Sequence, residues 1–87
     1  MEPKSARLYQ ILGESYRAQG QLDLAVRAYR EAAAAAPKMP EIHLALAEIH
    51  LGLGNRAQAR KEIEQELAIM PGSAAAMALK QQLGAAP

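Results

Sequence analysis

An internal repeat constrains the fold of this chain more than any other feature of its 87 residues. Residues 6–39 align without a gap with residues 40–73, an offset of 34. The residues that recur are Leu12 with Leu46, Glu14 with Glu48, Gly20 with Gly54, Ala25 with Ala59, and Pro37 with Pro71. A fixed period of this length indicates a repeat architecture in which each unit is one supersecondary element.

Within each repeat, apolar residues recur with helical spacing up to a glycine, resume after it and stop at a proline. This pattern predicts two helices per repeat, and Ser5, Pro40, Asn55 and Ser73 stand where helices are expected to begin. The expected helices cover residues 6–19, 23–36, 40–53, 56–70 and 74–84. The fold class is therefore all-α, with tandem antiparallel hairpins followed by a fifth helix.

The fifth helix, residues 74–84, is predicted to cap the second hairpin. One face carries Ala76, Leu79 and Leu83, and the rest of its surface is largely polar or small. The last element of a stacked array needs an outer face that tolerates water. We expect a single domain over residues 1–87, with a frayed Gly-Ala-Ala-Pro tail.

The composition argues against several classes of function. Ten Lys and Arg against nine Asp and Glu give a formal charge of +1, and the two signs are mixed along the chain. This balance predicts neither nucleic-acid binding nor membrane insertion. The chain has no cysteine, no bilayer-length apolar stretch and no signal-peptide core at its N-terminal end. We therefore expect a soluble, cytoplasmic protein.

These spacings resemble the tetratricopeptide repeat (TPR) family, in two repeats with the extra helix that commonly closes such arrays. The first repeat matches the family pattern with Tyr9, Leu12, Gly13, Tyr16, Gly20, Ala25, Tyr29, Ala32 and Pro37. The second matches with Leu46, Ala47, Gly54, Ala59, Ile63, Leu67 and Pro71. It departs from the pattern at His43 and His50, which stand at aromatic sites, and at Glu66, where the family prefers alanine.

The resemblance implies a right-handed stack of antiparallel hairpins, an α-solenoid fragment, whose first helices line a concave groove. Gly13 and Ala25 are expected to face each other where the helix axes of the first hairpin nearly touch. Gly20 and Gly54 are expected to turn the chain at positive φ without steric cost. Members of the family usually hold peptide segments or helices of partner proteins in the groove.

Side chains that could support catalysis or metal binding have structural explanations here. His43 and His50 are separated by about 10 Å along a helix, too far to share a metal ion, so we assign both to packing. The carboxylates predicted to lie on a solvated outer face are Glu62, Glu64 and Glu66. The sequence shows no activated nucleophile and no phosphate loop, and we predict neither an enzyme nor a bound metal or cofactor.

The face of each first helix opposite its packing side is the candidate binding site. Aliphatic residues stand there between charged ones, which is the composition of a modest binding groove. The predicted groove residues are Arg7, Gln10, Ile11, Glu14, Arg17, Glu41, Leu44, Glu48 and Leu51.

We therefore predict a protein–protein interaction scaffold that binds a peptide or helix of a partner protein in this groove. The alternative is a structural module that forms homo-oligomers, in which another copy covers the groove or packs near Leu8 and Ile11. RNA binding by a related class of helical repeats is a third possibility. The 34-residue period and the neutral charge balance disfavour it.

Overall fold

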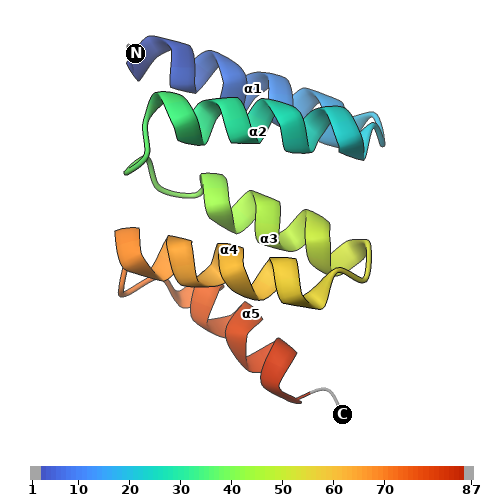
Figure 1. Cartoon of the computed structure of the whole chain (residues 1–87), viewed down its shortest axis with the longest axis vertical. Coiled ribbons are helices and arrows are strands. Elements are labelled where there is room, and N and C mark those ends of the chain that lie inside the picture. Colours follow the sequence, from blue (N-terminus) through green and yellow to red (C-terminus); the bar gives the residue numbers. More distant parts are fainter. Residues whose placement is uncertain (1–2, 86–87) are drawn as a thin grey trace. The chain divides into compact units, whose positions relative to one another are not determined.

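The computed structural model describes residues 3–85 and contains five α-helices over that range (Figure 1). They are α1 (Pro3–Ala18), α2 (Leu22–Ala35), α3 (Ile42–Gly52), α4 (Arg56–Ile69) and α5 (Ala74–Ala85). The predicted all-α fold is confirmed. The chain divides into two compact units, Met1–Ile42 with α1 and α2, and His43–Pro87 with nearly all of α3 and with α4 and α5.

The 34-residue period extends to the hydrogen bonds of the turns. In the first hairpin the N–H of Gln21 donates to the carbonyl of Tyr16 at 2.9 Å, and in the second the N–H of Asn55 donates to the carbonyl of His50 at 2.8 Å. This pattern closes a helix whose following residue is left-handed. Gly20 has a φ of 79°, and the glycine 34 residues later has a φ of 82°, as the sequence predicts.

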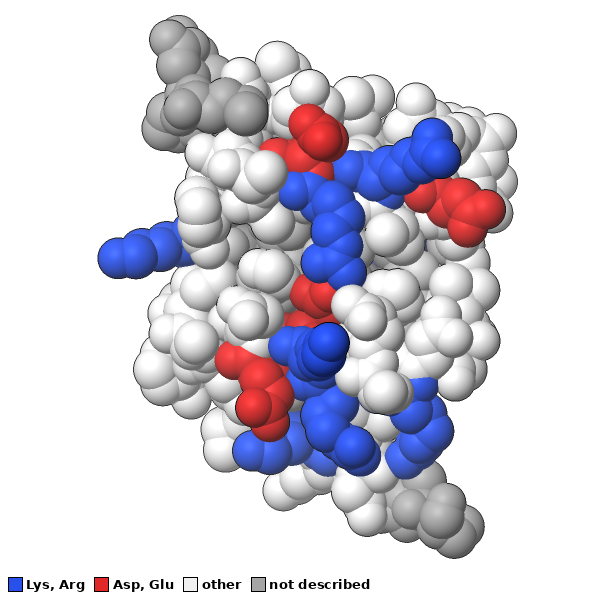
Figure 2. All heavy atoms as spheres, in the orientation of Figure 1, with Lys and Arg blue, Asp and Glu red and all other residues white. Residues whose placement is uncertain are grey.

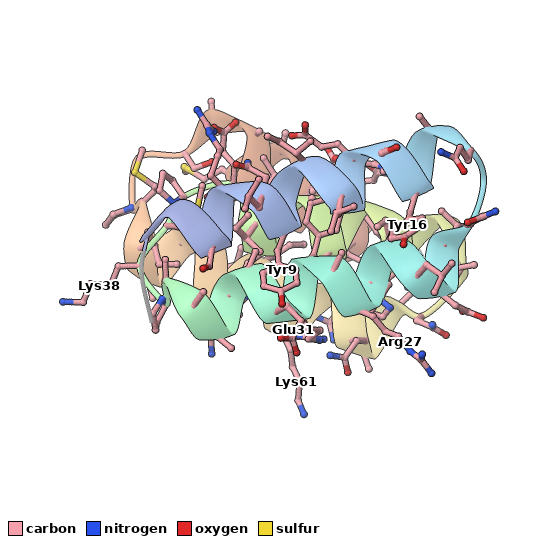
Figure 3. The ribbon with its side chains drawn as sticks, turned by 90° about the horizontal axis from the view of Figure 1, so that it is seen from above. Tyr9, Tyr16, Arg27, Glu31, Lys38 and Lys61 are labelled. Carbon is pink, nitrogen blue, oxygen red and sulfur yellow. The ribbon has the colours of Figure 1, made fainter. Side chains whose placement is uncertain are left out.

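In the first unit, α1 and α2 pack around small residues and one aromatic ring. Tyr29 is buried, and three of its ring atoms lie 2.9 Å from the point where a Cβ on Gly13 would stand. Ala25, the predicted contact partner of Gly13, is fully buried, and the ring of Tyr29 fills the space beside the glycine. Tyr9 and Tyr16 extend from α1 toward α2 and are half-buried (Figure 3).

Three helices share the core of the second unit. Its buried members are Ala47 from α3, Ala59 and Ile63 from α4, and Ala76 and Leu83 from α5. Leu79 packs against this cluster, so the apolar face predicted for the fifth helix covers the second hairpin as expected. The guanidinium of Arg56, at the start of α4, donates a hydrogen bond to the carbonyl of Leu83 at 2.5 Å and joins the two helices at their ends.

Two predicted helix starts are wrong. Ser5 lies inside α1, because the helix begins at Pro3, a residue suited to a first turn since it lacks an N–H group. Pro40 lies before α3, because Glu41 adopts a φ of 78°, which a right-handed helix cannot contain. The helix therefore begins at Ile42.

The other two predicted helix starts, Asn55 and Ser73, lie directly before the helices that they were expected to begin. Asn55 precedes α4, but its side chain makes no capping hydrogen bond to the described part of the helix. Ser73 caps α5, and its Oγ accepts a hydrogen bond from the N–H of Ala76 at 3.1 Å. Of the tail predicted to fray, Gly84 and Ala85 belong to α5, and residues 86–87 lie outside the described residues.

Candidate protein-binding surface

The outer side of α1 carries the predicted groove residues of the first repeat. Arg7, Ile11 and Glu14 are exposed and follow one another at spacings of four and three residues, so they share one side of the helix. Arg17 is half-buried. Gln10 was expected in the groove but is only 9% exposed, and its Oε1 accepts a hydrogen bond from Nη1 of Arg7 at 3.0 Å. Gln10 therefore helps to orient Arg7, and little of its own side chain is exposed.

The same helix exposes two leucines that the groove prediction left out. Leu12 matches the family pattern of the first repeat, yet it is 44% exposed, and Leu8 is 63% exposed. The reason is that Gly13 makes the contact with Tyr29, and the preceding side chain points about 100° away around the helix. We call Leu8, Ile11 and Leu12 the α1 stripe; Ile11 is 52% exposed.

The groove residues predicted on the second repeat are less accessible than expected. Glu41 is not on α3 at all, since it lies in the left-handed turn before that helix. Glu48 is exposed on α3. Leu44 and Leu51 were expected as exposed anchors, but both are half-buried and pack against the core of the second unit. Two members of that core come from α5, so the fifth helix helps to bury these leucines.

Helix α4 carries two buried carboxylates, which corrects the predicted solvated outer face. Glu62 is 2% exposed and Glu66 is 1% exposed, whereas Glu64 is exposed as expected. Oε1 of Glu62 lies 2.7 Å from Nδ1 of His43 on α3, and Gln58 donates a hydrogen bond to Oε2 at 3.2 Å. A buried carboxylate requires such partners, because removal from water is otherwise strongly unfavourable.

The second buried carboxylate holds the start of α3. Oε1 of Glu66 accepts a hydrogen bond from the backbone N–H of Leu44 at 3.3 Å. The first turn of a helix leaves its N–H groups without intrahelical acceptors, and a negative charge there is favourable. The alignment contains the signal for both glutamates, because they stand 34 residues after Ala28 and Ala32, which are buried.

Three further observations concern histidine, metal ligands and membrane spans within residues 3–85. His50 is buried, in agreement with its predicted packing role. Over that range the structure holds no group of three or more His, Asp or Glu side chains arranged to bind a metal ion. None of the helices in the same range combines the length and apolar character needed to cross a bilayer.

An apolar cavity of about 660 Å³ adjoins Arg7 in the first unit. Its lining consists of Arg7, Ala35, Ala36, Pro37, Lys38 and Met39. The side chain of Lys38 extends away from the helices into solvent (Figure 3). The first unit therefore presents an apolar hollow with two basic side chains at its edge. In the second unit another cavity, of about 450 Å³, lies between α4 and α5 beside Leu67 and Met77.

The outer side of α2 is a solvated helix surface. Arg27 and Glu31 are exposed and point away from α1 (Figure 3). Figure 2 shows acidic side chains lying among the basic ones on the face in view. This distribution agrees with the mixed charges of the sequence.

The sequence was compared with known protein families and with curated proteins. The Tetratricopeptide repeat family matches residues 16–83, from the last turn of α1 to the last turn of α5. A search of curated proteins gives no match. Repeats of this family generally mediate protein–protein interactions, and its members are typically non-enzymatic scaffolds. Because the match covers most of the chain and agrees with the paired helices and their 34-residue period, the chain belongs to the tetratricopeptide repeat family.

Proposed function

We propose that the chain is a non-enzymatic scaffold that holds a peptide segment or helix of a partner protein on the outer sides of its first helices. The observation that carries this proposal is the row of Arg7, Ile11 and Glu14 on α1, which leads to the apolar cavity beside Arg7. Apolar side chains of a partner would anchor in the cavity, and the charges would set register and selectivity.

The predicted affinity is moderate. The accessible groove residues are few, since Gln10, Leu44 and Leu51 are partly or wholly engaged inside the protein. The ordering of a flexible partner also offsets much of the contact energy. We expect dissociation constants of about micromolar magnitude.

Selection of binders from a displayed library of random peptides tests this function. Met39→Asp places a carboxylate in the apolar cavity and should weaken the selected peptides roughly tenfold, since an anchor of this size contributes on the order of 1 kcal/mol. Glu14→Lys, in the same row of α1, should alter which peptides bind. Arg27→Ser with Arg60→Ser, on the outer sides of α2 and α4, is the matched control. If the control weakens binding and Met39→Asp does not, the partner binds those outer sides and the groove assignment is wrong.

Self-assembly is a second candidate function, favoured by a specific observation. The α1 stripe exposes three large aliphatic side chains next to one another. Exposed apolar clusters on small proteins commonly mark interfaces.

A further inference from the structure

The α1 stripe is uncovered within the described chain. Leu8, Ile11 and Leu12 lie three and four residues apart, so their side chains form one continuous patch on a single side of α1. A helix face of this composition is usually buried against another element.

Charged side chains of opposite sign border this patch along one edge. Arg7 and Glu14 are both exposed and lie two helical turns apart, with Ile11 between them in the same row. The edge is therefore positive toward the start of α1 and negative toward its end. A surface with this polarity is complementary to itself when one copy is reversed.

We propose that the α1 stripe pairs with the same stripe of a second copy of this chain, with the two α1 helices antiparallel about a two-fold axis near residues 10–11. The proposal rests on self-assembly, the second candidate function given above, and identifies its interface. A pair of this kind covers Ile11 and engages Arg7 and Glu14, so it competes with a peptide for that row. The two-fold axis brings like edges together in reversed order, so Arg7 meets Glu14 of the partner subunit at both ends. A parallel pairing, about an axis along the helices, would place the charged edges of the two copies on opposite sides of the seam, where Arg7 and Glu14 would not meet. Such self-complementary two-fold contacts are the commonest form of homo-oligomer.

The apolar part of the pairing is tested by sedimentation velocity over a concentration series. Leu8→Ser with Leu12→Ser should raise the dimer dissociation constant at least about tenfold, because both exposed side chains are buried only in the pair. Leu24→Ser with Leu53→Ser is the matched control, since these leucines are also exposed but lie outside the stripe. The control should dimerise like the parent, and equal far-UV circular dichroism should show that all variants remain folded.

The antiparallel order is tested by charge reversal. Arg7→Glu and Glu14→Arg should each weaken self-association roughly fivefold or more, because each replaces two attractive pairs by two repulsive ones. An equimolar mixture of the two variants should recover dimerisation to within about twofold of the parent, since every contact in the mixed dimer is again between opposite charges. A mixture that associates no better than its components overturns the antiparallel pairing.

Other outcomes separate self-pairing from the proposed scaffold function. A parent that stays monomeric at all concentrations overturns the pairing, and its binding of selected library peptides leaves the scaffold function intact. A monomer whose selected peptides are lost on Leu8→Ser with Leu12→Ser shows that a partner segment occupies the stripe instead. A dimer that depends on the stripe but binds no peptide supports the pairing and contradicts the scaffold function.

Discussion

The two hairpins share one backbone arrangement but bury different kinds of side chain between their helices. Between α1 and α2 the Tyr29 ring fits against Gly13, and alanines 28 and 32 line the buried side of α2. Between α3 and α4, glutamates take the places of both alanines, and His43 stands where the first hairpin has Tyr9. The first hairpin is joined through shape and apolar contact, whereas the second adds a buried polar network.

The comparison shows which part of the repeat is fixed. The turn hydrogen bonds and the positive φ of the turn glycines recur in both hairpins, although several of the side chains between the helices differ. The period therefore specifies the backbone, and the interior can be filled in more than one way. The stability of a variant in which residues of one hairpin replace their counterparts in the other shows whether the two interiors are interchangeable.

The largest expected effect comes from His43→Leu. It removes the partner that lies 2.7 Å from the buried Glu62 carboxylate. Removing a hydrogen-bond partner from a buried carboxylate is strongly unfavourable, so we expect the free energy of unfolding to fall by about 3 kcal/mol. Denaturant unfolding measures this change, and a variant as stable as the parent would show that the contact contributes nothing.

A double variant that places the corresponding residues of the first hairpin in the second should avoid the loss caused by His43→Leu. His43→Tyr with Glu62→Ala reproduces Tyr9 and Ala28 in the second repeat. Replacing both members of a buried pair by well-packed apolar groups is often neutral or stabilising. The double variant should therefore be clearly more stable than His43→Leu. If it is less stable, the polar network is required by its surroundings and the two interiors are not interchangeable.

An intermediate effect is expected for Gly13→Ala. Alanine favours a helix over glycine by about 0.5–1 kcal/mol, but overpacking costs about 1–3 kcal/mol. The clash should prevail, because a Cβ would stand 2.9 Å from the buried Tyr29 ring, giving a net loss of about 1 kcal/mol in thermal unfolding.

Two further variants identify the cause of that loss. Gly52→Ala is the control, since a Cβ there meets nothing within 4 Å, and its stability should be unchanged or slightly higher. Adding Tyr29→Ile to Gly13→Ala copies Ala47 and Ile63 of the second hairpin, and the combined loss should be smaller than the sum of the single losses. Strict additivity would contradict the proposed clash.

The smallest effect concerns the helix caps of the second unit. Ser73→Ala should lower stability by about 0.5 kcal/mol, because the Ser73 hydroxyl accepts the N–H of Ala76. Asn55→Ala should change it by no more than a few tenths of a kcal/mol, since that side chain makes no capping hydrogen bond to the described helix. Equal losses from the two variants would mean that their capping roles do not differ.

The helices and turns could be predicted from the sequence because periodicity, glycine and proline act locally. The left-handed conformation of Glu41 could not be predicted in this way, because it depends on how the chain enters α3. The burial of Glu62 and Glu66 was missed because charged residues are usually exposed unless paired, and their partners come from a different helix. Leu44 and Leu51 are less exposed than predicted, because helical spacing gives the face of α3 but not the core that those leucines contact.

The three tyrosines all belong to the unit Met1–Ile42, and the chain has no tryptophan. Tyrosine fluorescence and near-UV circular dichroism consequently report on that unit alone, while far-UV circular dichroism reports on the helices of both. If residues 1–87 act as one domain, the spectroscopic signals must change over the same temperature range. The uneven placement of the aromatic residues thus gives the protein a natural internal label with which cooperativity between its halves can be measured without adding a probe.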